Sequence, residues 1–178
     1  MNGERRAERP MDALDVIVDE VREWLPGVEV TGLSVTGRIL RLARDLESLR
    51  EETLRPFELT VGDYDMLATL RRRAAEGSMK IRDLQRSSML SSGGTTKRLD
   101  RLEGAGLIER HPDPDDRRGT LITLSSRGLE LISEAVPAVI GRESALVREA
   151  IGSNRRRETV EDGLRQMLLA VESPTDAV

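Results

Sequence analysis

The sequence predicts a mostly α-helical protein with a small β-wing, and two features of its pattern predict this class. Apolar residues recur three or four positions apart through most of the 178 residues, as amphipathic helices require. One segment differs, because alternating apolar and polar residues flank the stretch HPDPDDRRG and indicate two paired strands. Two short helices precede this hairpin, which is the order of elements in a winged helix-turn-helix.

Composition excludes several classes of protein. The chain has no cysteine, one histidine and one each of Trp, Tyr and Phe, with a net charge of −4. We therefore expect no disulfide, no cysteine-ligated metal and no aromatic platform for single-stranded nucleic acid. We find no apolar run long enough to span a membrane and no signal segment, so we expect a cytoplasmic protein without a membrane partner. No catalytic residues, metal ligands or cofactors are predicted.

The N-terminal part contains two amphipathic helices. Residues 11–24 place apolar side chains at helical spacing, and Pro26-Gly27 ends that pattern. Residues 34–55 repeat the pattern after a short break. The apolar positions of the first helix are Met11, Leu14, Ile17 or Val18, Val21 and Trp24, and those of the second are Val35, Ile39, Leu42, Leu46 and Leu49.

A third helix is predicted to begin after Thr60, with Asp63 as the capping partner three residues later. Its apolar face comprises Tyr64, Leu67, Leu70 and Ala74. A short helix over residues 81–87 follows, as the first helix of a helix-turn-helix.

The stretch SSGGTTKRLDRLEGAGL predicts the second, recognition helix of that motif. Ser91 or Ser92 can cap it, which would place Gly93-Gly94 inside the helix, and Gly104 and Gly106 end it. Thr95, Leu99 and Leu102 form its buried stripe. At about 100° per residue, Lys97 then points outward, whereas Arg98 lies roughly 60° from the buried direction and could reach back towards the body of the protein.

The hairpin tip is too long and too charged for a simple two-residue turn. Pro112 and Pro114 stiffen it, and the basic pair Arg117-Arg118 follows three aspartates. An isolated hairpin of this kind is usually a solubilising loop, but after a recognition helix it is expected to be a wing. Asp115 and Asp116 would then hold the wing arginines in position.

The C-terminal part again contains amphipathic helices, over residues 126–152 and 155–172, with a kink or a new turn expected at Pro137. Together with the N-terminal helices they carry more apolar surface than one small winged domain can bury, which predicts a homodimer. We therefore expect N-terminal helices for dimerisation and for covering a ligand pocket (1–56), a winged helix-turn-helix (57–126) and C-terminal dimerisation helices (127–178).

Three segments resemble one known family. LTVGDYDMLATLRR, SSGGTTKRLDRLEGAGLIERHPDPDDRRG and ITLSSRGLELI are similar to the corresponding parts of the MarR family of dimeric winged-helix transcriptional regulators. The similarity covers roughly residues 34–150. It implies a triangular dimer in which N- and C-terminal helices join two DNA-binding lobes.

A narrower resemblance is to the urate-responsive subfamily. It implies a ligand site formed by Trp24, Asp65, Arg72 and Arg98 for a small anionic effector, with aromatic and purine-like anions among the candidates. Spacing alone leaves other interpretations open. Asp65 and Arg72, seven residues apart, could both lie on a solvated helix face, and Trp24 could be a core or dimer-interface aromatic.

The sequence thus predicts a ligand-responsive, sequence-specific regulator, a repressor that leaves its double-stranded DNA operator when the effector binds. Ser91, Ser92, Thr96 and Lys97 would contact the major groove, and Arg117 and Arg118 would serve the minor groove. Two alternatives remain: a DNA-binding regulator without a ligand, and a winged helix that serves as a protein-interaction module.

Overall fold

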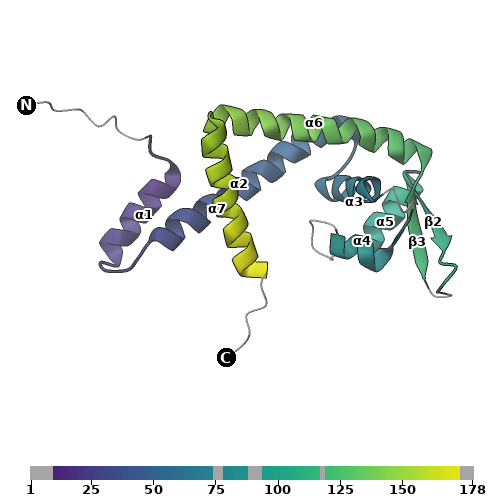
Figure 1. Cartoon of the computed structure of the whole chain (residues 1–178), viewed down its shortest axis with the longest axis horizontal. Helices are drawn as coiled ribbons and strands as arrows, with labels where there is room; N and C mark the ends of the chain where they lie inside the picture. Colours follow the sequence, from purple (N-terminus) through teal and green to yellow (C-terminus); the bar gives the residue numbers. More distant parts are fainter. Residues whose placement is uncertain (1–9, 74–77, 88–93, 117–118, 173–178) are drawn as a thin grey trace, which may run out of the picture. The chain divides into compact units, whose positions relative to one another are not determined.

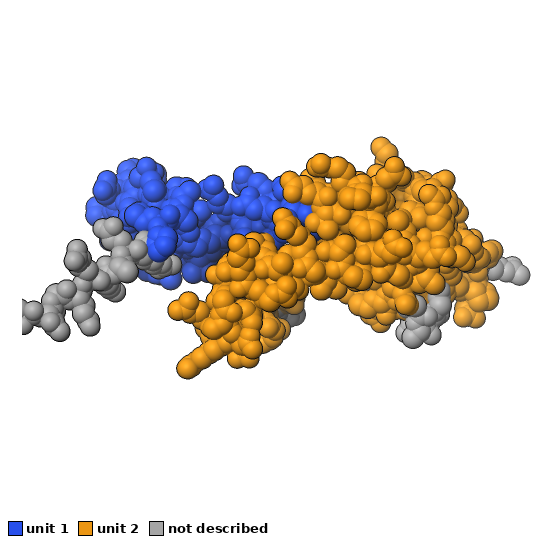
Figure 2. Space-filling view, turned by 90° about the horizontal axis from the view of Figure 1, so that it is seen from above, with its two compact units in different colours: residues 1–50 blue, residues 51–178 orange. Residues whose placement is uncertain are grey.

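The computed structural model describes residues 10–73, 78–87, 94–116 and 119–172 and divides the chain into two compact units, residues 1–50 and 51–178 (Figure 2). Helices make up most of the chain and three short strands form one sheet (Figure 1), which confirms the predicted fold class. The elements are α1 (Ala13–Trp24), α2 (Thr31–Leu54), the 3-10 turn η1 (Arg55–Phe57), α3 (Val61–Arg72), β1 (Met79–Lys80), α4 (Ile81–Ser87), α5 (Thr95–Gly104), β2 (Ile108–Pro112), β3 (Thr120–Leu124), α6 (Ser126–Ile151) and α7 (Asn154–Glu172).

The first unit is a pair of helices held by charge and by apolar contact. A capping box of Asp12 and Asp15 begins α1, and Arg38 of α2 donates to both carboxylates, at 2.8 and 2.6 Å. The bonds from Arg38 and from the amides of Leu14 and Asp15 lower the pKa of Asp12, and those from the Asp12 amide and from Arg38 lower the pKa of Asp15. Leu14 is buried directly over Gly37, where a Cβ would lie 2.7 Å from its Cδ1 atom.

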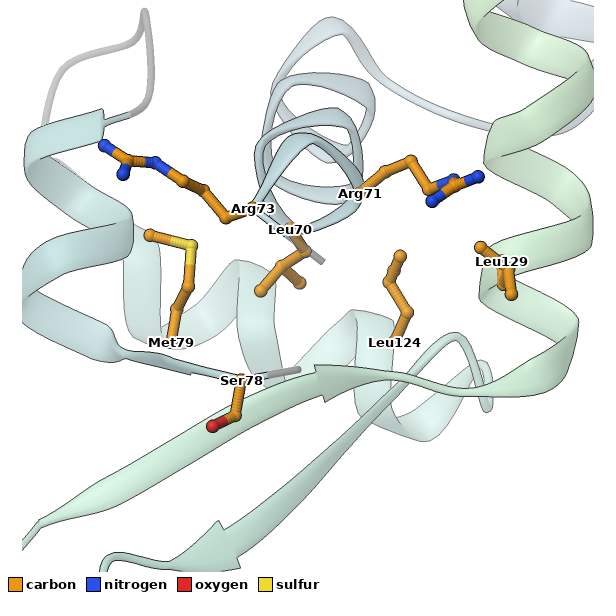
Figure 3. Close-up of a pocket in the computed structure, with 7 residues that line it drawn as sticks. All are labelled: Leu70, Arg71, Arg73, Ser78, Met79, Leu124 and Leu129. Carbon is orange, nitrogen blue, oxygen red and sulfur yellow. The ribbon is translucent and has the colours of Figure 1, made fainter. Parts of the chain in front are cut away.

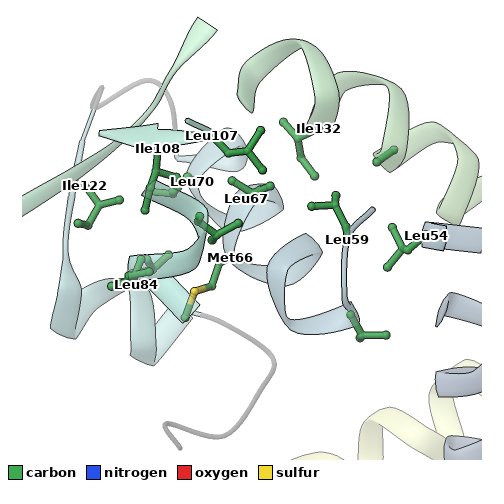
Figure 4. Packing of buried hydrophobic residues seen from close by; sticks show 14 of the residues in the cluster. Leu54, Leu59, Met66, Leu67, Leu70, Leu84, Leu107, Ile108, Ile122 and Ile132 are labelled. Carbon is green, nitrogen blue, oxygen red and sulfur yellow. The ribbon is translucent and has the colours of Figure 1, made fainter. Parts of the chain in front are cut away.

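The second unit has one apolar core (Figure 4), to which α3, α5, α6 and the sheet all contribute. The predicted capping box is confirmed: the Thr60 hydroxyl accepts from the Asp63 amide at 3.2 Å, and Asp63 accepts from the Thr60 amide at 3.0 Å. Eight of the twelve residues of α3 are buried, so this helix is the centre of the unit. The largest fully buried side chains are Leu54, Leu67, Leu84, Leu99, Leu102, Ile108, Ile122, Ile132 and Val139.

The sheet has the strand order β1-β3-β2 and is antiparallel throughout. β2 and β3 form the predicted hairpin, in which Ile108 pairs with Leu124 and Pro112 with Thr120. The sequence analysis missed β1, whose two residues Met79 and Lys80 pair with Ile122 and Leu121. Two residues are too few to show an alternating pattern, so periodicity could not have revealed this strand.

The corner after β3 explains the motif Leu124-Ser125-Ser126-Arg127-Gly128. Ser125 caps α6 by accepting from the Gly128 amide at 2.9 Å, and its hydroxyl donates to the Gly106 carbonyl at 2.6 Å. Arg127 donates to the Ala105 carbonyl at the end of α5. A Cβ at position 128 would lie 1.9 Å from the Leu107 carbonyl oxygen, so glycine is required there.

The C-terminal helices leave much apolar surface open. α6 continues through Pro137 as a single helix of 26 residues, so the new turn expected there is not formed. No residue of α7 is buried, and Leu164, Leu168 and Val171 are 47%, 57% and 82% exposed. Even so, none of the described helices combines the length and the apolar character that crossing a membrane demands.

Candidate nucleic-acid interface

The recognition helix α5 begins at Thr95, and its N-cap is Gly94 with φ +80°, a conformation that favours glycine. The predicted cap by Ser91 or Ser92 is therefore wrong, as is the placement of Gly94 inside the helix. Gly94 has no side chain to cap this end of α5, and none of the described residues supplies a capping side chain in its place. Ser91, Ser92 and Gly93 lie outside the described residues.

The faces of α5 are as its spacing predicts. Thr95, Leu99 and Leu102 are buried at 3%, 0% and 2% exposure, whereas Thr96 and Lys97 are exposed. Arg98 is half-buried. Its guanidinium lies so close to α3 that a Cβ on Gly62 would be 2.5 Å from Cζ and 2.6 Å from Nε. Arg98 thus reaches back towards the body of the protein, one of the two orientations that the sequence left open.

A basic hollow of about 310 Å³ lies beside the start of α5. It is lined by Gly94, Lys97, Arg98 and Arg101, and none of these is acidic. The positive end of the helix adds to the same field. This basic hollow is therefore suited to bind an anion of phosphate size at the exposed side of α5.

Two further arginines connect α5 to its surroundings, and the sequence analysis missed both. Arg101 pairs with Asp63 of the α3 capping box and donates to the Thr60 hydroxyl at 3.2 Å. Arg110 of β2 pairs with Asp100 at 2.6 Å and with Glu103 at 3.2 Å, which joins the wing to α5. The only available signal was charge complementarity, and the Arg101 and Asp63 positions are 38 residues apart.

The base of the wing is held by a buried aspartate. The side chain of Asp113 is 2% exposed and pairs with Lys80 of β1 at 2.6 Å. It also accepts from the Asp115 amide at 2.9 Å, and its own amide donates to the Gly119 carbonyl at 3.1 Å. The Lys80 ammonium lowers the pKa of Asp113, and the carboxylate raises the pKa of Lys80. Arg117 and Arg118 lie outside the described residues, so the predicted role of Asp115 and Asp116 in holding them stays a prediction.

His111 is an exposed residue of β2. Its Nε2 atom lies 3.1 Å from the Thr123 hydroxyl on the facing strand. The part of the chain that the structure describes brings no three histidine or carboxylate side chains together as a metal site would.

The four predicted ligand residues have different environments. Trp24 ends α1 in the first unit and is 76% exposed in the single chain. In the second unit Asp65 is buried at 9% exposure and Arg72 is exposed, so a solvated face does not describe Asp65. Gly62, Asp65 and Arg72 follow one another at spacings of three and seven residues, which places them along one face of α3. The Arg98 guanidinium lies over the first of these positions.

A second hollow, of about 170 Å³, lies at the junction of α3, the sheet and α6 (Figure 3). Its lining is largely apolar, with Leu70, Met79, Leu124 and Leu129. The side chains of Arg71 and Arg73 extend to opposite sides and away from one another. Charged groups therefore do not converge on a bound molecule here, as they do in specific ligand sites.

Comparisons with known proteins agree with this geometry. The MarR family model matches residues 59–120. The regulator PecS of Dickeya dadantii is 32% identical over 127 residues, which cover 71% of this chain and 76% of PecS. AbsC of Streptomyces coelicolor, a MarR family transcriptional regulator of known structure, is 26% identical with a TM-score of 0.68, over 81% of this chain and 96% of AbsC. The S. aureus MepR–DNA complex shares the fold, with a TM-score of 0.69 at 20% identity, over 76% of this chain and 97% of MepR.

Proposed function

The chain belongs to the MarR family of winged-helix, DNA-binding transcriptional regulators, and on that premise we propose that it is a homodimeric repressor released from its operator by a small anionic ligand. Such regulators are not enzymes. The observation that carries the proposal is the exposed, basic side of α5, where Lys97, Arg98 and Arg101 line a hollow beside the start of the helix.

In the proposed complex α5 enters the major groove of double-stranded DNA. Thr96 and Lys97 are exposed on its outer side, which suits contacts with bases and phosphates. Ser91 and Ser92, just before the helix, complete the proposed set. Arg117 and Arg118 at the wing tip would serve the minor groove, where narrow A·T-rich segments attract arginine. The neighbour MepR, solved as a DNA complex, has the same fold and supports this assignment.

Dimerisation is proposed from the apolar side chains that one chain leaves open. On α7 these include Val160, Leu164, Leu168 and Val171. A contiguous apolar surface of this kind is uncommon in a protein that functions as a monomer. A second copy would cover it and would place two recognition helices on one duplex.

The ligand response is proposed for the polar face of α3. Without ligand, Asp65 would hold Arg98 and so keep α5 in its DNA-binding position. An anion bound by Arg72 would displace Asp65. The ligand needs only to prefer the arrangement that does not bind DNA. A coupling of about 1–3 kcal/mol would weaken DNA binding roughly 5- to 150-fold.

One experiment tests this function. The protein is titrated onto the intergenic duplex upstream of its own coding sequence, with an unrelated duplex as the control, at several salt concentrations. We expect preferential, salt-dependent binding that urate or an aromatic carboxylate weakens, and Arg72→Ala should abolish the ligand response but not DNA binding. Binding that no anion alters would favour the ligand-independent regulator. Absence of any preference for the upstream duplex would contradict the function and favour the protein-interaction module.

A further inference from the structure

Two arginines of the recognition helix contact the protein itself. Arg98 and Arg101 lie one turn apart on α5, and both contact the first turn of α3. Lys97, the residue before Arg98, is exposed and lines the same hollow. Arginines on such a helix are usually assigned to DNA phosphates, so their contacts with the protein need a separate explanation.

Arg101 is bound by Thr60 and Asp63, the two residues that cap the start of α3. Asp63 is 3% exposed, and one of its oxygens accepts from the Thr60 amide at 3.0 Å and from the Thr60 hydroxyl at 2.7 Å. Its other oxygen takes the Arg101 guanidinium, which also donates to the Thr60 hydroxyl. The same carboxylate therefore caps α3 and anchors α5.

Arg98 occupies the neighbouring position on that turn. Three atoms of its guanidinium lie within 2.6 Å of the place where a Cβ on Gly62 would be. The absence of a side chain at position 62 is what admits the guanidinium. Gly62 and the Thr60–Asp63 pair thus form two adjacent contact sites on α3, and each site binds one arginine of the recognition helix.

Resting on the proposed function, we propose that this first turn of α3 fixes the orientation of the recognition helix. Arg101 is then a positioning residue that acts through Asp63 and Thr60, and Arg98 is a second one that acts through Gly62. An ion pair between a buried carboxylate and arginine strengthens the hydrogen bonds that hold α5 against α3. The phosphate contacts on this helix fall to Lys97 and to the amide groups at its start.

The salt dependence of DNA binding separates positioning from phosphate contact. The affinity for DNA falls as salt rises, and removing a phosphate contact reduces the magnitude of the slope of log affinity against log salt by about one. We expect this reduction for Lys97→Ala. Asp63→Asn and Arg101→Ala should each weaken operator binding between about 5- and 150-fold with an unchanged slope. The double variant should be no weaker than either single variant, because both remove the same contact. A slope lowered by about one in Arg101→Ala, or additive losses, would overturn the proposal.

Matched controls are present in the first unit. Asp15 stands at the same position of the α1 capping box and also pairs with an arginine of the next helix, but not with α5. Asp15→Asn should therefore leave DNA affinity unchanged. Gly32 is the second residue of α2, as Gly62 is of α3, and a Cβ there meets nothing within 4 Å. Gly62→Ala should weaken DNA binding, and Gly32→Ala should not.

Hydrogen exchange of the free protein tests the same point without DNA. Asp63→Asn should speed amide exchange across α5 while the amides of α6 keep their protection. Unchanged protection of α5 would overturn the positioning role even if the wild-type protein bound no operator. Failure of wild-type DNA binding alone would contradict the proposed function instead.

Discussion

α3 and α7 are both amphipathic helices, but their surroundings in the single chain are opposite. α3 buries eight of its twelve residues in the core of the second unit, including two aspartates and a threonine. α7 has nineteen residues and buries none of them. The winged region therefore completes its own core within one chain, whereas the C-terminal helix carries apolar side chains that a second molecule would have to cover.

The largest effect is expected from charge on the open face of α7. Leu164→Glu combined with Leu168→Glu should give monomers or aggregates, because buried carboxylates would oppose a dimer contact. Sedimentation velocity measures the species directly. The paired substitutions Thr159→Glu and Gln166→Glu add the same charge at exposed positions of α7 and should leave the assembly unchanged. A well-folded, DNA-binding dimer carrying both leucine substitutions would place the dimer contact elsewhere.

A core substitution should sharpen the comparison. Leu67 is 0% exposed at the centre of the second unit, so Leu67→Ala should lower the free energy of unfolding by about 2–5 kcal/mol. Gln166 is an exposed polar residue of α7, and Gln166→Ala should change the free energy of unfolding by less than about 0.5 kcal/mol. Urea unfolding at one protein concentration compares the two. Equal losses would mean that α7 is as well packed as α3.

A third test concerns binding rather than stability. Arg117→Ala should weaken operator binding about fivefold or more while the melting temperature stays the same, because a minor-groove arginine contributes charge and not core packing. Fluorescence anisotropy with labelled duplex measures the affinity. Arg155→Ala, at an exposed position of α7, serves as the control. Affinity equal to wild type at moderate salt would remove Arg117 from the interface.

The smallest effect is expected from the ion pair at the base of the wing. The pKa of Asp113 is lower in the folded protein than in the unfolded chain, because Lys80 and the Asp115 amide stabilise its carboxylate. Its stabilising contribution is therefore present above the unfolded pKa of about 3.9 and is lost as the pH falls through the depressed folded value. Asp113→Asn should remove that part of the acid dependence of the unfolding free energy. The wild-type and variant curves should converge towards low pH, and a constant offset between them would contradict this account.

Local features were predictable from the sequence, and long-range ones were not. The Thr60–Asp63 cap was predicted because its partners are three residues apart and the pattern is specific. The same Asp63 also anchors Arg101, but nothing local distinguishes that arginine from its neighbours. The buried face of α5 was predicted from its periodicity. The residue at which the helix begins was not, because a glycine in a left-handed conformation stands where a serine cap was expected.

The wing shows the same division. Its hairpin was predicted from alternation on either side of a charged tip. Its attachment depends on Lys80 and Asp113, which come from a strand of two residues and from one of three nearby aspartates. Only the fold brings this pair together, so the sequence assigned structural roles to Asp115 and Asp116 and none to Asp113.

Hydroxyl-radical footprinting of the upstream duplex is the most direct test of a dimer that reads DNA with paired winged domains. We predict two protected segments of equal strength, related by two-fold symmetry and spaced by one or more helical turns of about 10 base pairs. Lys97→Ala should weaken both segments together. A single protected segment, or uniform protection without a preferred site, would contradict the account.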